Sequence, residues 1–404
     1  MARSKGPRDS SATGPTVPAA DLDIFSSPLV DRIRRHGNTW DLAGGQLLLP
    51  EVFGFCRGVT RALVMLSQAV AAHRDPHQRL FLLGQIIHNP WVNDHFSRRG
   101  VRILTADELA DLAKIISADD CAIIPAFGVP LPIETHLRAL GCRIVDTSCG
   151  DVRRLWSWAG DAVAGGFGVL IFGRAMHDET VVIKSRLAAA GGRYLVVGDL
   201  PEAQRFCDMV SGAAPAEGFG ATFGPQETNA ASLEPFLRLA QVSQTTMLYD
   251  QTMLLRERVR ACFAARFGAD GLGDRLLFQP TVCRATQARQ AAAVKLCQGG
   301  CDLVVVVGGF GSSNTRHLFE LARSFCPAYF IEDAGAILSA ERVQTFDPAA
   351  GRATVAENWL PAKRPLRIGV LAGASSPEVV VGEVLQRLAA FLGAEGSGGA
   401  ETNA

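Results

Sequence analysis

Short apolar runs alternate with helix-like segments along this chain, and this alternation limits its fold more than any other feature. The runs are rich in Val, Ile and Leu and show no regular apolar–polar alternation, which is typical of strands covered on both faces. They lie at Gln46–Pro50, Leu80–Leu83, Ala122–Pro125, Arg143–Asp146, Gly168–Gly173, Arg193–Gly198, Asp302–Gly308, Ala328–Ile331 and Arg367–Ala372. Amphipathic helical spacing occurs between them, at Val59–Val70, Leu318–Ala322 and Val379–Leu392. The sequence therefore predicts an α/β fold with parallel sheets.

The 404 residues are enough for two to three domains. Both ends, residues 1–44 and 392–404, are rich in small, polar and charged residues without periodicity, and we expect them to be flexible tails. Between them a unit of strand, glycine-bearing loop and helix recurs. The expected α/β domains span residues 45–150, 151–280 and 281–391, the second with a Gly/Ala/Pro-rich inserted loop near 208–232.

Charge and hydropathy exclude several kinds of partner. Lys and Arg total 40 and Asp and Glu total 40, so the chain has no electrostatic footprint for nucleic acid. No apolar stretch reaches the length of about 18 residues that a membrane-spanning helix needs. The basic N-terminus has no apolar core behind it, which argues against a secretory signal. We therefore expect a cytoplasmic protein without nucleic-acid or membrane partners.

Three of the ten cysteines lie in turns between a strand and a helix, one in each third of the chain: Cys56, Cys149 and Cys283. A helix N-terminus lowers the pKa of a thiol and makes the thiolate a good metal ligand. Three soft sulfur ligands suit an iron–sulfur cluster that keeps one iron open to substrate. Position alone leaves open that these are three unrelated thiols. No CxxC pair occurs, so the sequence excludes a zinc ribbon or a thioredoxin motif.

Polar groups follow several strands at the point where a helix begins. In parallel sheets, ligands bind at this edge, where helix N-termini offer free N–H groups. Ser312, Ser313 and Asn314 follow one strand, and Ser375 follows another. Their geometry suits capture of an anion, although Ser and Asn at a helix start also act as ordinary N-caps.

Nine motifs occur in a fixed order along the chain. They are Gly54-Phe55-Cys56-x-Gly58-Val59, Ile87-His88-Asn89-Pro90-Trp91-Val92, Ala126-Phe127-Gly128-Val129, Asp146-Thr147-Ser148-Cys149, His177-Asp178-Glu179, Gln244-Thr245-Thr246, Cys283-Arg284-Ala285-Thr286-Gln287-x-Arg289-Gln290, Ser312-Ser313-Asn314 and Ala372-Gly373-Ala374-Ser375-Ser376-Pro377-Glu378. In this order they resemble the LytB/IspH family, the 4-hydroxy-3-methylbut-2-enyl diphosphate reductases. The resemblance covers about residues 47 to 390, and the last three motifs are the most specific.

The resemblance implies a trefoil of three small parallel-sheet α/β domains around a central iron–sulfur cluster. The cluster of the family is [4Fe–4S], and its three cysteines correspond to Cys56, Cys149 and Cys283. The implied reaction is reductive dehydroxylation of (E)-4-hydroxy-3-methylbut-2-enyl diphosphate to isopentenyl and dimethylallyl diphosphate. This reaction is the last step of the methylerythritol phosphate pathway of isoprenoid biosynthesis. Ferredoxin or flavodoxin is the implied electron donor.

The resemblance also implies roles for individual side chains. Glu179 is the expected proton source, Thr245 relays or orients through its hydroxyl, and His177 hydrogen-bonds near the substrate. The expected diphosphate contacts come from His88, Ser312, Ser313, Asn314 and Ser375. Taken singly, each of these residues also has an ordinary structural interpretation, as a cap, a turn residue or a strand residue.

Phe127 departs from the family, which has a histidine here that contacts the diphosphate. A phenyl ring cannot donate to a phosphate oxygen, and losing one such donor costs about 1.5–3 kcal/mol of binding. Two enzyme hypotheses therefore stand: a diverged reductase of the same substrate, or a LytB-like paralogue that reduces a different allylic or aromatic substrate in specialised metabolism. A cluster-bearing redox sensor is a third hypothesis, and His177, Glu179 and Thr245 argue against it because a sensor needs no proton relay.

Overall fold

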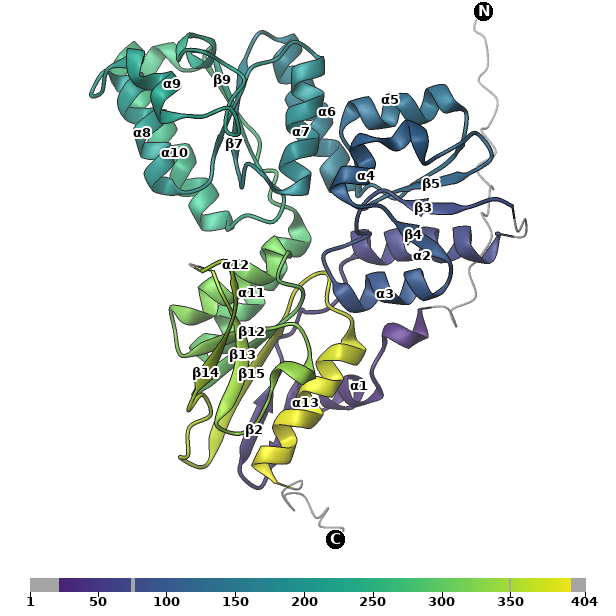
Figure 1. Ribbon diagram of the computed structural model, residues 1–404. Helices are drawn as coiled ribbons and strands as arrows, with labels where there is room; N and C mark the ends of the chain where they lie inside the picture. Colours follow the sequence, from purple (N-terminus) through teal and green to yellow (C-terminus); the bar gives the residue numbers. More distant parts are fainter. Residues whose placement is uncertain (1–21, 74–76, 349, 394–404) are drawn as a thin grey trace, which may run out of the picture.

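The computed structural model describes residues 22–73, 77–348 and 350–393. Three sheets, each flanked by helices, form three lobes that meet at a common centre (Figure 1). The first sheet is parallel throughout, with the order β4 (Val101–Ile103), β3 (Leu80–Leu82), β5 (Cys121–Ile124), β6 (Arg143–Asp146). Its helices are α2 (Arg57–Ala71), α3 (Pro90–Arg98), α4 (Ala106–Ala110) and α5 (Leu131–Leu140).

The second sheet is also parallel, with the order β10 (Leu276–Phe278), β9 (Leu239–Ser243), β7 (Gly168–Phe172), β8 (Tyr194–Val197). Its helices are α6 (Gly150–Ala164), α7 (Asp178–Ala189), α8 (Leu200–Ser211), α9 (Phe219–Thr222) and α10 (Tyr249–Phe267). Buried apolar residues fill β7 from end to end, as the unbroken apolar run predicts for a central parallel strand.

The third sheet combines both ends of the described chain. Its order is β1 (Thr39–Leu42), β2 (Gly45–Leu48), β15 (Leu366–Ala372), β11 (Leu303–Val307), β12 (Ala328–Ile331), and only the β1–β2 pair is antiparallel. Its helices are α1 (Pro28–Arg35), α11 (Arg284–Gln298), α12 (Ser313–Arg323) and α13 (Glu378–Leu392). A separate hairpin is formed by β13 (Arg342–Asp347) and β14 (Arg352–Glu357).

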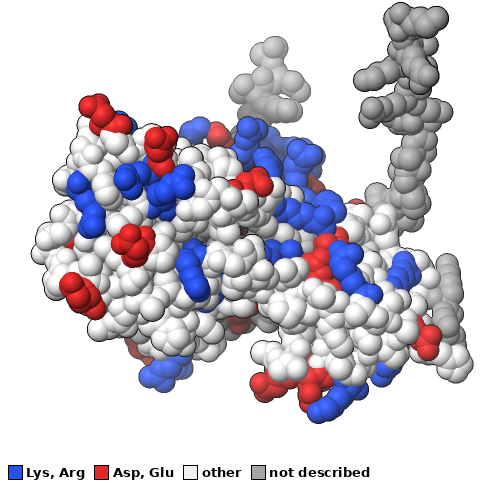
Figure 2. All heavy atoms as spheres, turned by 90° about the horizontal axis from the view of Figure 1, so that it is seen from above, with Lys and Arg blue, Asp and Glu red and all other residues white. Residues whose placement is uncertain are grey.

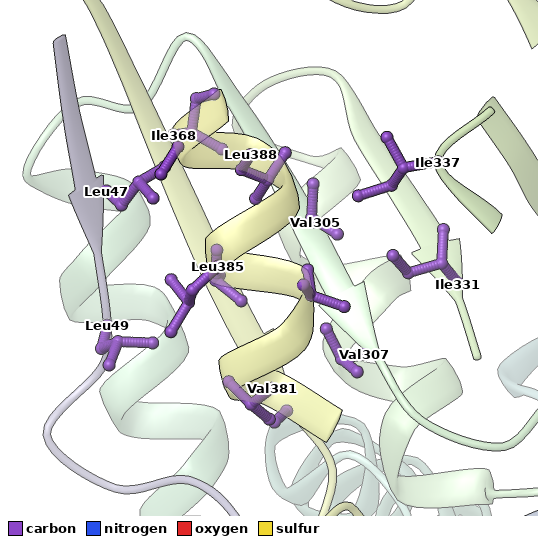
Figure 3. Close-up of a cluster of buried hydrophobic side chains, with 14 of the residues drawn as sticks. Leu47, Leu49, Val305, Val307, Ile331, Ile337, Ile368, Val381, Leu385 and Leu388 are labelled. Atoms are coloured by element: carbon purple, nitrogen blue, oxygen red, sulfur yellow. The ribbon is translucent and has the colours of Figure 1, made fainter. Parts of the chain in front are cut away.

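Helix α13 covers one face of the third sheet. Val381, Leu385 and Leu388 of this helix are fully buried against strand residues such as Val305 and Ile368 (Figure 3). Each side chain buried in this way contributes about 1.5–3 kcal/mol to stability. This core fixes the sheet edge at which β11 and β15 end.

Part of the segment expected to be an N-terminal tail is structured. Within residues 22–44, Ser27 caps α1 by accepting a hydrogen bond from the Val30 N–H at 3.4 Å, α1 packs against α13, and β1 pairs with β2. The expectation of a flexible tail is wrong for these residues because their apolar side chains find partners at the far end of the chain. Residues 1–21 of that tail, and residues 394–404 of the other, lie outside the described residues.

Two further expectations about organisation need correction. Strand β2 lies inside the expected first domain, yet it pairs with β15 of the third sheet. The insertion near residues 208–232 is not a plain loop, because it carries the end of α8 and all of α9. Phe219 and Phe223 anchor it in the core of the second lobe, and Leu195 forms a strand bridge with Thr228. We propose three units built on the three sheets, with residues 27–54 assigned to the third, while Phe25 packs in the core of the first.

The surface carries no face of a single charge in the view of Figure 2, where basic and acidic side chains are interspersed. This distribution agrees with the zero formal net charge. Within the described part of the chain, no helix combines the length and apolarity needed to cross a bilayer.

Candidate active site

One cavity at the centre of the molecule is lined by all three cysteines of the strand-to-helix turns. Cys56, Cys149 and Cys283 are the N-cap residues of α2, α6 and α11. The sulfur of Cys56 accepts a hydrogen bond from the Val59 N–H, and that of Cys283 accepts one from Thr286, both at 3.4 Å. The cavity has a volume of about 120 Å³. Three helix N-termini therefore present sulfur to one small space.

Gly58 is required by the close approach of two of these thiols. A Cβ atom at this position would lie 2.7 Å from the sulfur of Cys149 and 3.7 Å from that of Cys56. Arg61, one helical turn later, donates to the carbonyl oxygen of Ser148 at 3.1 Å and so ties α2 to the turn of Cys149. The first and second cysteine turns are thus held against each other.

Arg289 links the third cysteine turn to the first. Its guanidinium is buried and donates to the carbonyl oxygens of Ala285 at 2.9 Å and Gly54 at 2.6 Å. This role was not predicted from the sequence, although Arg289 lies within the motif that begins at Cys283. Arg289 lies six residues after Cys283 on α11, on a buried part of the helix. Because arginine is rarely buried unless it is paired, an arginine on an otherwise buried helix face indicates a contact with another element.

The pKa of the thiols departs from expectation. Burial raises the pKa of Cys149, and it raises the pKa of Cys283 to about 11. The expectation that a helix N-terminus lowers these pKa values is wrong for both, because desolvation of the thiolate outweighs the backbone N–H groups. Coordination to a metal reverses this balance, since a bound cation deprotonates its thiol ligand.

The donor set fits an iron–sulfur cluster better than a single metal ion. Among the described residues, no three His, Cys, Asp or Glu side chains could hold one ion together. In a cluster the thiolates bind different iron atoms, so they surround a space rather than converge on a point. Cys56, Cys149 and Cys283 are free thiols around such a space, and Gly58 leaves it open. The residues present therefore fit this group.

Glu179 lies in the same cavity and is almost completely buried. Thr245 contacts both of its carboxyl oxygens, with the backbone N–H donating to Oε1 at 2.6 Å and the hydroxyl donating to Oε2 at 2.7 Å. Burial raises the pKa of Glu179 to about 7, although the two bonds from Thr245 work in the opposite direction. The side chain is thus a buried acid that can carry a proton at neutral pH.

His177 caps α7, the helix on which Glu179 lies. Its Nδ1 accepts a hydrogen bond from the Glu179 N–H at 3.2 Å, so Nδ1 is unprotonated and Nε2 carries the hydrogen. Burial, reinforced by the charge of His88, lowers the pKa of His177 to about 3. The imidazole is therefore a neutral donor at the cavity wall.

His88 and Phe127 stack on each other, with ring centroids 4.7 Å apart and planes within 9°. Nε2 of His88 also lies 2.8 Å from a carboxylate oxygen of Asp178, a contact that was not foreseen because the two residues are far apart in sequence. Burial raises the pKa of Asp178, but the hydrogen bond to His88 and the charge of that histidine outweigh it and lower that pKa overall. Phe127 thus supports the ring of His88 rather than a ligand oxygen.

The Ser-Ser-Asn motif also lines the cavity, at the start of α12. Ser312 is the N-cap, its hydroxyl oxygen accepts from the Thr315 N–H at 3.3 Å, and the Ser375 hydroxyl lies 3.3 Å away. Asn314 accepts from the Ala374 N–H at 3.0 Å through Oδ1. The hydroxyl of Ser313 and the Nδ2 of Asn314 are buried without a hydrogen-bond partner in the described chain.

Such unpartnered donors indicate that a ligand completes the site. The structure therefore brings together all of the residues predicted from the sequence, since the cavity is lined by Cys56, His88, Cys149, His177, Glu179, Thr245, Cys283, Ser312, Ser313, Asn314 and Ser375. Their individual roles stay predictions.

A test of the cysteine geometry follows from Gly58. The Gly58→Ala variant should lower the iron and sulfide bound after reconstitution, because the new methyl group displaces Cys149; overpacking of this kind costs about 1–3 kcal/mol. Gly150→Ala is the matched control, since a Cβ there meets open space. Equal iron content in both variants would contradict this geometry, and melting curves would show that both chains fold.

The fold and the site together define a three-lobed α/β protein with a central cavity lined by cysteines and a buried acid. The family model described as LytB protein matches residues 47–389, and the chain belongs to this family. It is 36% identical to the 4-hydroxy-3-methylbut-2-enyl diphosphate reductase of Gloeobacter violaceus, covering 93% of this chain and 89% of the relative. The reductase of Thermosynechococcus vestitus is 34% identical over 91% of this chain and 90% of its own.

Two solved structures show the same fold. The structure of an (E)-4-hydroxy-3-methyl-but-2-enyl diphosphate reductase matches with a TM-score of 0.51 at 24% identity, over 85% of this chain and 98% of that chain. The structure of the E-1-hydroxy-2-methyl-but-2-enyl-4-diphosphate reductase from Plasmodium falciparum matches with a TM-score of 0.60 at 19% identity, over 85% and 86% of the two chains. The expected fold is confirmed.

Proposed function

We propose that this chain is an oxidoreductase that converts (E)-4-hydroxy-3-methylbut-2-enyl diphosphate, two electrons and two protons into isopentenyl or dimethylallyl diphosphate and water. The observation that carries the proposal is the single cavity that contains the three thiols, the buried acid and the unpartnered anion donors. The names and the extent of the relatives support the same substrate.

A [4Fe–4S] cluster held by Cys56, Cys149 and Cys283 would supply the electrons and a Lewis-acidic iron. The protein contributes the turns that hold the three thiols, the small residue Gly58 between two of them, and the buried link through Arg289. Apolar neighbours such as Val59 and Ile87 line the same space and limit the access of water.

Glu179 supplies the proton that the departing hydroxyl group needs. At neutral pH its carboxyl group is protonated in part, because burial raises its pKa to about 7. Thr245 holds both oxygens of the Glu179 carboxyl group in place. After Glu179 has given up its proton, the Thr245 hydroxyl can pass a new proton to the carboxylate. Departure of the hydroxyl group as water, rather than as hydroxide, lowers the barrier to the reduction.

The diphosphate is bound by neutral donors. Ser313 and Asn314 offer a hydroxyl and an amide group without partners, and the N-terminus of α12 offers backbone N–H groups and a positive dipole end. His177 offers its Nε2–H from the start of α7, while His88 is held by Asp178. Ser312 and Ser375 complete the set.

An electron donor is also required, and we propose a ferredoxin or a flavodoxin, as the family resemblance implies. A LytB-like paralogue acting on another allylic or aromatic substrate is the second candidate. The observation that favours it is Phe127, whose ring stacks on His88 and places an apolar surface where the family has a phosphate donor.

Turnover by the reconstituted protein separates these two candidates. The protein, loaded anaerobically with a cluster that is checked by its visible absorbance, is mixed with reduced methyl viologen and (E)-4-hydroxy-3-methylbut-2-enyl diphosphate. We expect rapid oxidation of the dye and formation of both products. An intact cluster without turnover would reject this substrate and favour the paralogue.

A further inference from the structure

A second and larger cavity adjoins the one that holds the cysteines. Its volume is about 510 Å³, and it shares His88 and His177 with the smaller cavity. Two arginines line it, Arg174 from the loop before α7 and Arg316 from α12, so they come from two different lobes (Figure 1). The two histidines therefore line both cavities, and none of the three thiols lines the larger one.

Neither arginine has an ion-pair partner among the described residues. The Nε of Arg316 is buried without any hydrogen-bond partner, and its guanidinium lies 4.8 Å from the centre of the Phe346 ring. Arg174 is exposed, and the backbone N–H of this residue donates to Gln244 at 3.2 Å, which fixes the loop. Both charges are thus available to a ligand.

The two arginines also repel each other. Burial, and then the charge of Arg174, lowers the pKa of the Arg316 guanidinium. A pair of like charges in a partly desolvated cavity is unfavourable unless an anion lies between them.

Three carboxylates line the same cavity, but each has a donor of its own. Asp178 contacts His88, Glu202 accepts from the Gly198 N–H at 2.6 Å, and Glu227 accepts from the Gly224 N–H at 3.0 Å. None of the three forms an ion pair with either arginine, and the charge of Glu320, which favours the charged form of Arg316, does not outweigh burial and the charge of Arg174.

We propose that Arg174 and Arg316 form an outer anion-binding site, which receives the diphosphate of the substrate before it passes the two histidines and reaches Ser313 and Asn314. The proposal rests on the proposed function for the identity of the anion. Helix α12 connects the two stages, because Ser313 at its first turn faces the small cavity and Arg316, three residues later, lines the large one. Charge at the entrance raises the rate of capture of an anionic substrate.

Binding of inorganic pyrophosphate to the cluster-loaded full chain, measured by calorimetry at low salt, tests the site. Arg316→Gln should weaken this binding about ten-fold or more, as should Arg174→Gln. Arg323→Gln is the matched control, because it lies exposed on the same helix with its guanidinium over Phe319. Equal pyrophosphate affinity in the Arg316→Gln and Arg323→Gln variants would overturn the proposal.

Kinetics distinguish an entrance site from a structural role. In the Arg316→Gln variant we expect KM to rise about ten-fold with kcat changed less than about two-fold, and the difference to shrink at high salt. A fall in kcat with unchanged pyrophosphate affinity would overturn the proposal.

The Asn314→Ala variant separates the two stages. This variant should still bind pyrophosphate weakly at the outer site, and adding Arg316→Gln should remove that binding. If the remaining binding does not change when Arg316→Gln is added, the proposal is overturned. Pyrophosphate binding through Arg316 without any turnover would reject the proposed function and leave the outer site standing.

Discussion

Replacing Glu179 with glutamine should lower kcat about 100- to 10,000-fold, the range typical of losing a general acid. Glutamine keeps the size of the side chain, and its oxygen can still accept the bond from the Thr245 N–H, while its NH2 group can donate to the Thr245 hydroxyl instead of accepting from it; it has no acidic proton to give. Cluster content and substrate affinity should change little, because Glu179 contacts neither the cysteines nor the Ser-Ser-Asn wall through any hydrogen bond in the described structure.

The dependence of kcat/KM on pH tests whether protonated Glu179 is the active form. The pKa of Glu179 is raised to about 7, so the acid is protonated below that pH and ionised above it. Wild-type kcat/KM should therefore fall as the pH rises through about 7, and this limb should be absent in the Glu179→Gln variant. Glu257→Gln, an exposed change on α10, is the control. A Glu179→Gln variant that keeps most of its activity and the same pH limb would show that another group supplies the proton.

Replacing Cys283 with serine should abolish turnover and most of the visible absorbance of the reconstituted protein. A hydroxyl group is a poor ligand for iron in a cluster, and the two remaining thiols, Cys56 and Cys149, hold only one side of the space. Changing a residue that only supports a metal ligand typically lowers activity about 10- to 100-fold. The decrease in activity of the Cys283→Ser variant should be larger.

Cys326→Ser is the matched control for this experiment, since Cys326 is also a half-buried free thiol but lies in the core between α12 and β12. It should reconstitute like the wild type. Normal iron content in the Cys283→Ser variant would contradict the assignment of this ligand, and a lower melting temperature of the iron-free chain would show that the loss is one of folding.

All nine apolar runs that the sequence predicts as strands are strands in the structure. Strands β7 and β11 are buried throughout, as an unbroken apolar run predicts, whereas β6 is only partly buried. Strand β9 escaped prediction since it carries Gln241 and Ser243, which are buried and satisfied by bonds to Thr252. The hairpin of β13 and β14 escaped it because these strands are partly exposed.

The members of the candidate site could be named from the sequence because their motifs occur in a fixed order. The environment of these residues could not be predicted from the sequence, because it depends on contacts between lobes. The bond between His88 and Asp178 and the link from Arg289 to Gly54 each join residues that are distant in sequence. The raised pKa values of Cys149 and Cys283 follow from burial, which no local pattern of residues reveals.

The pairing of β2 with β15 has a consequence for the order of events during synthesis. A short loop connects β2 to Cys56, whose backbone N–H donates to the carbonyl oxygen of Ala374 at 3.3 Å. The cysteine that leaves the ribosome first is therefore placed last, after β15 has emerged. Nascent chains fold from the N-terminus onward. We therefore expect that an iron–sulfur cluster can be inserted only after synthesis of the chain is complete, because the three cysteines come together only then.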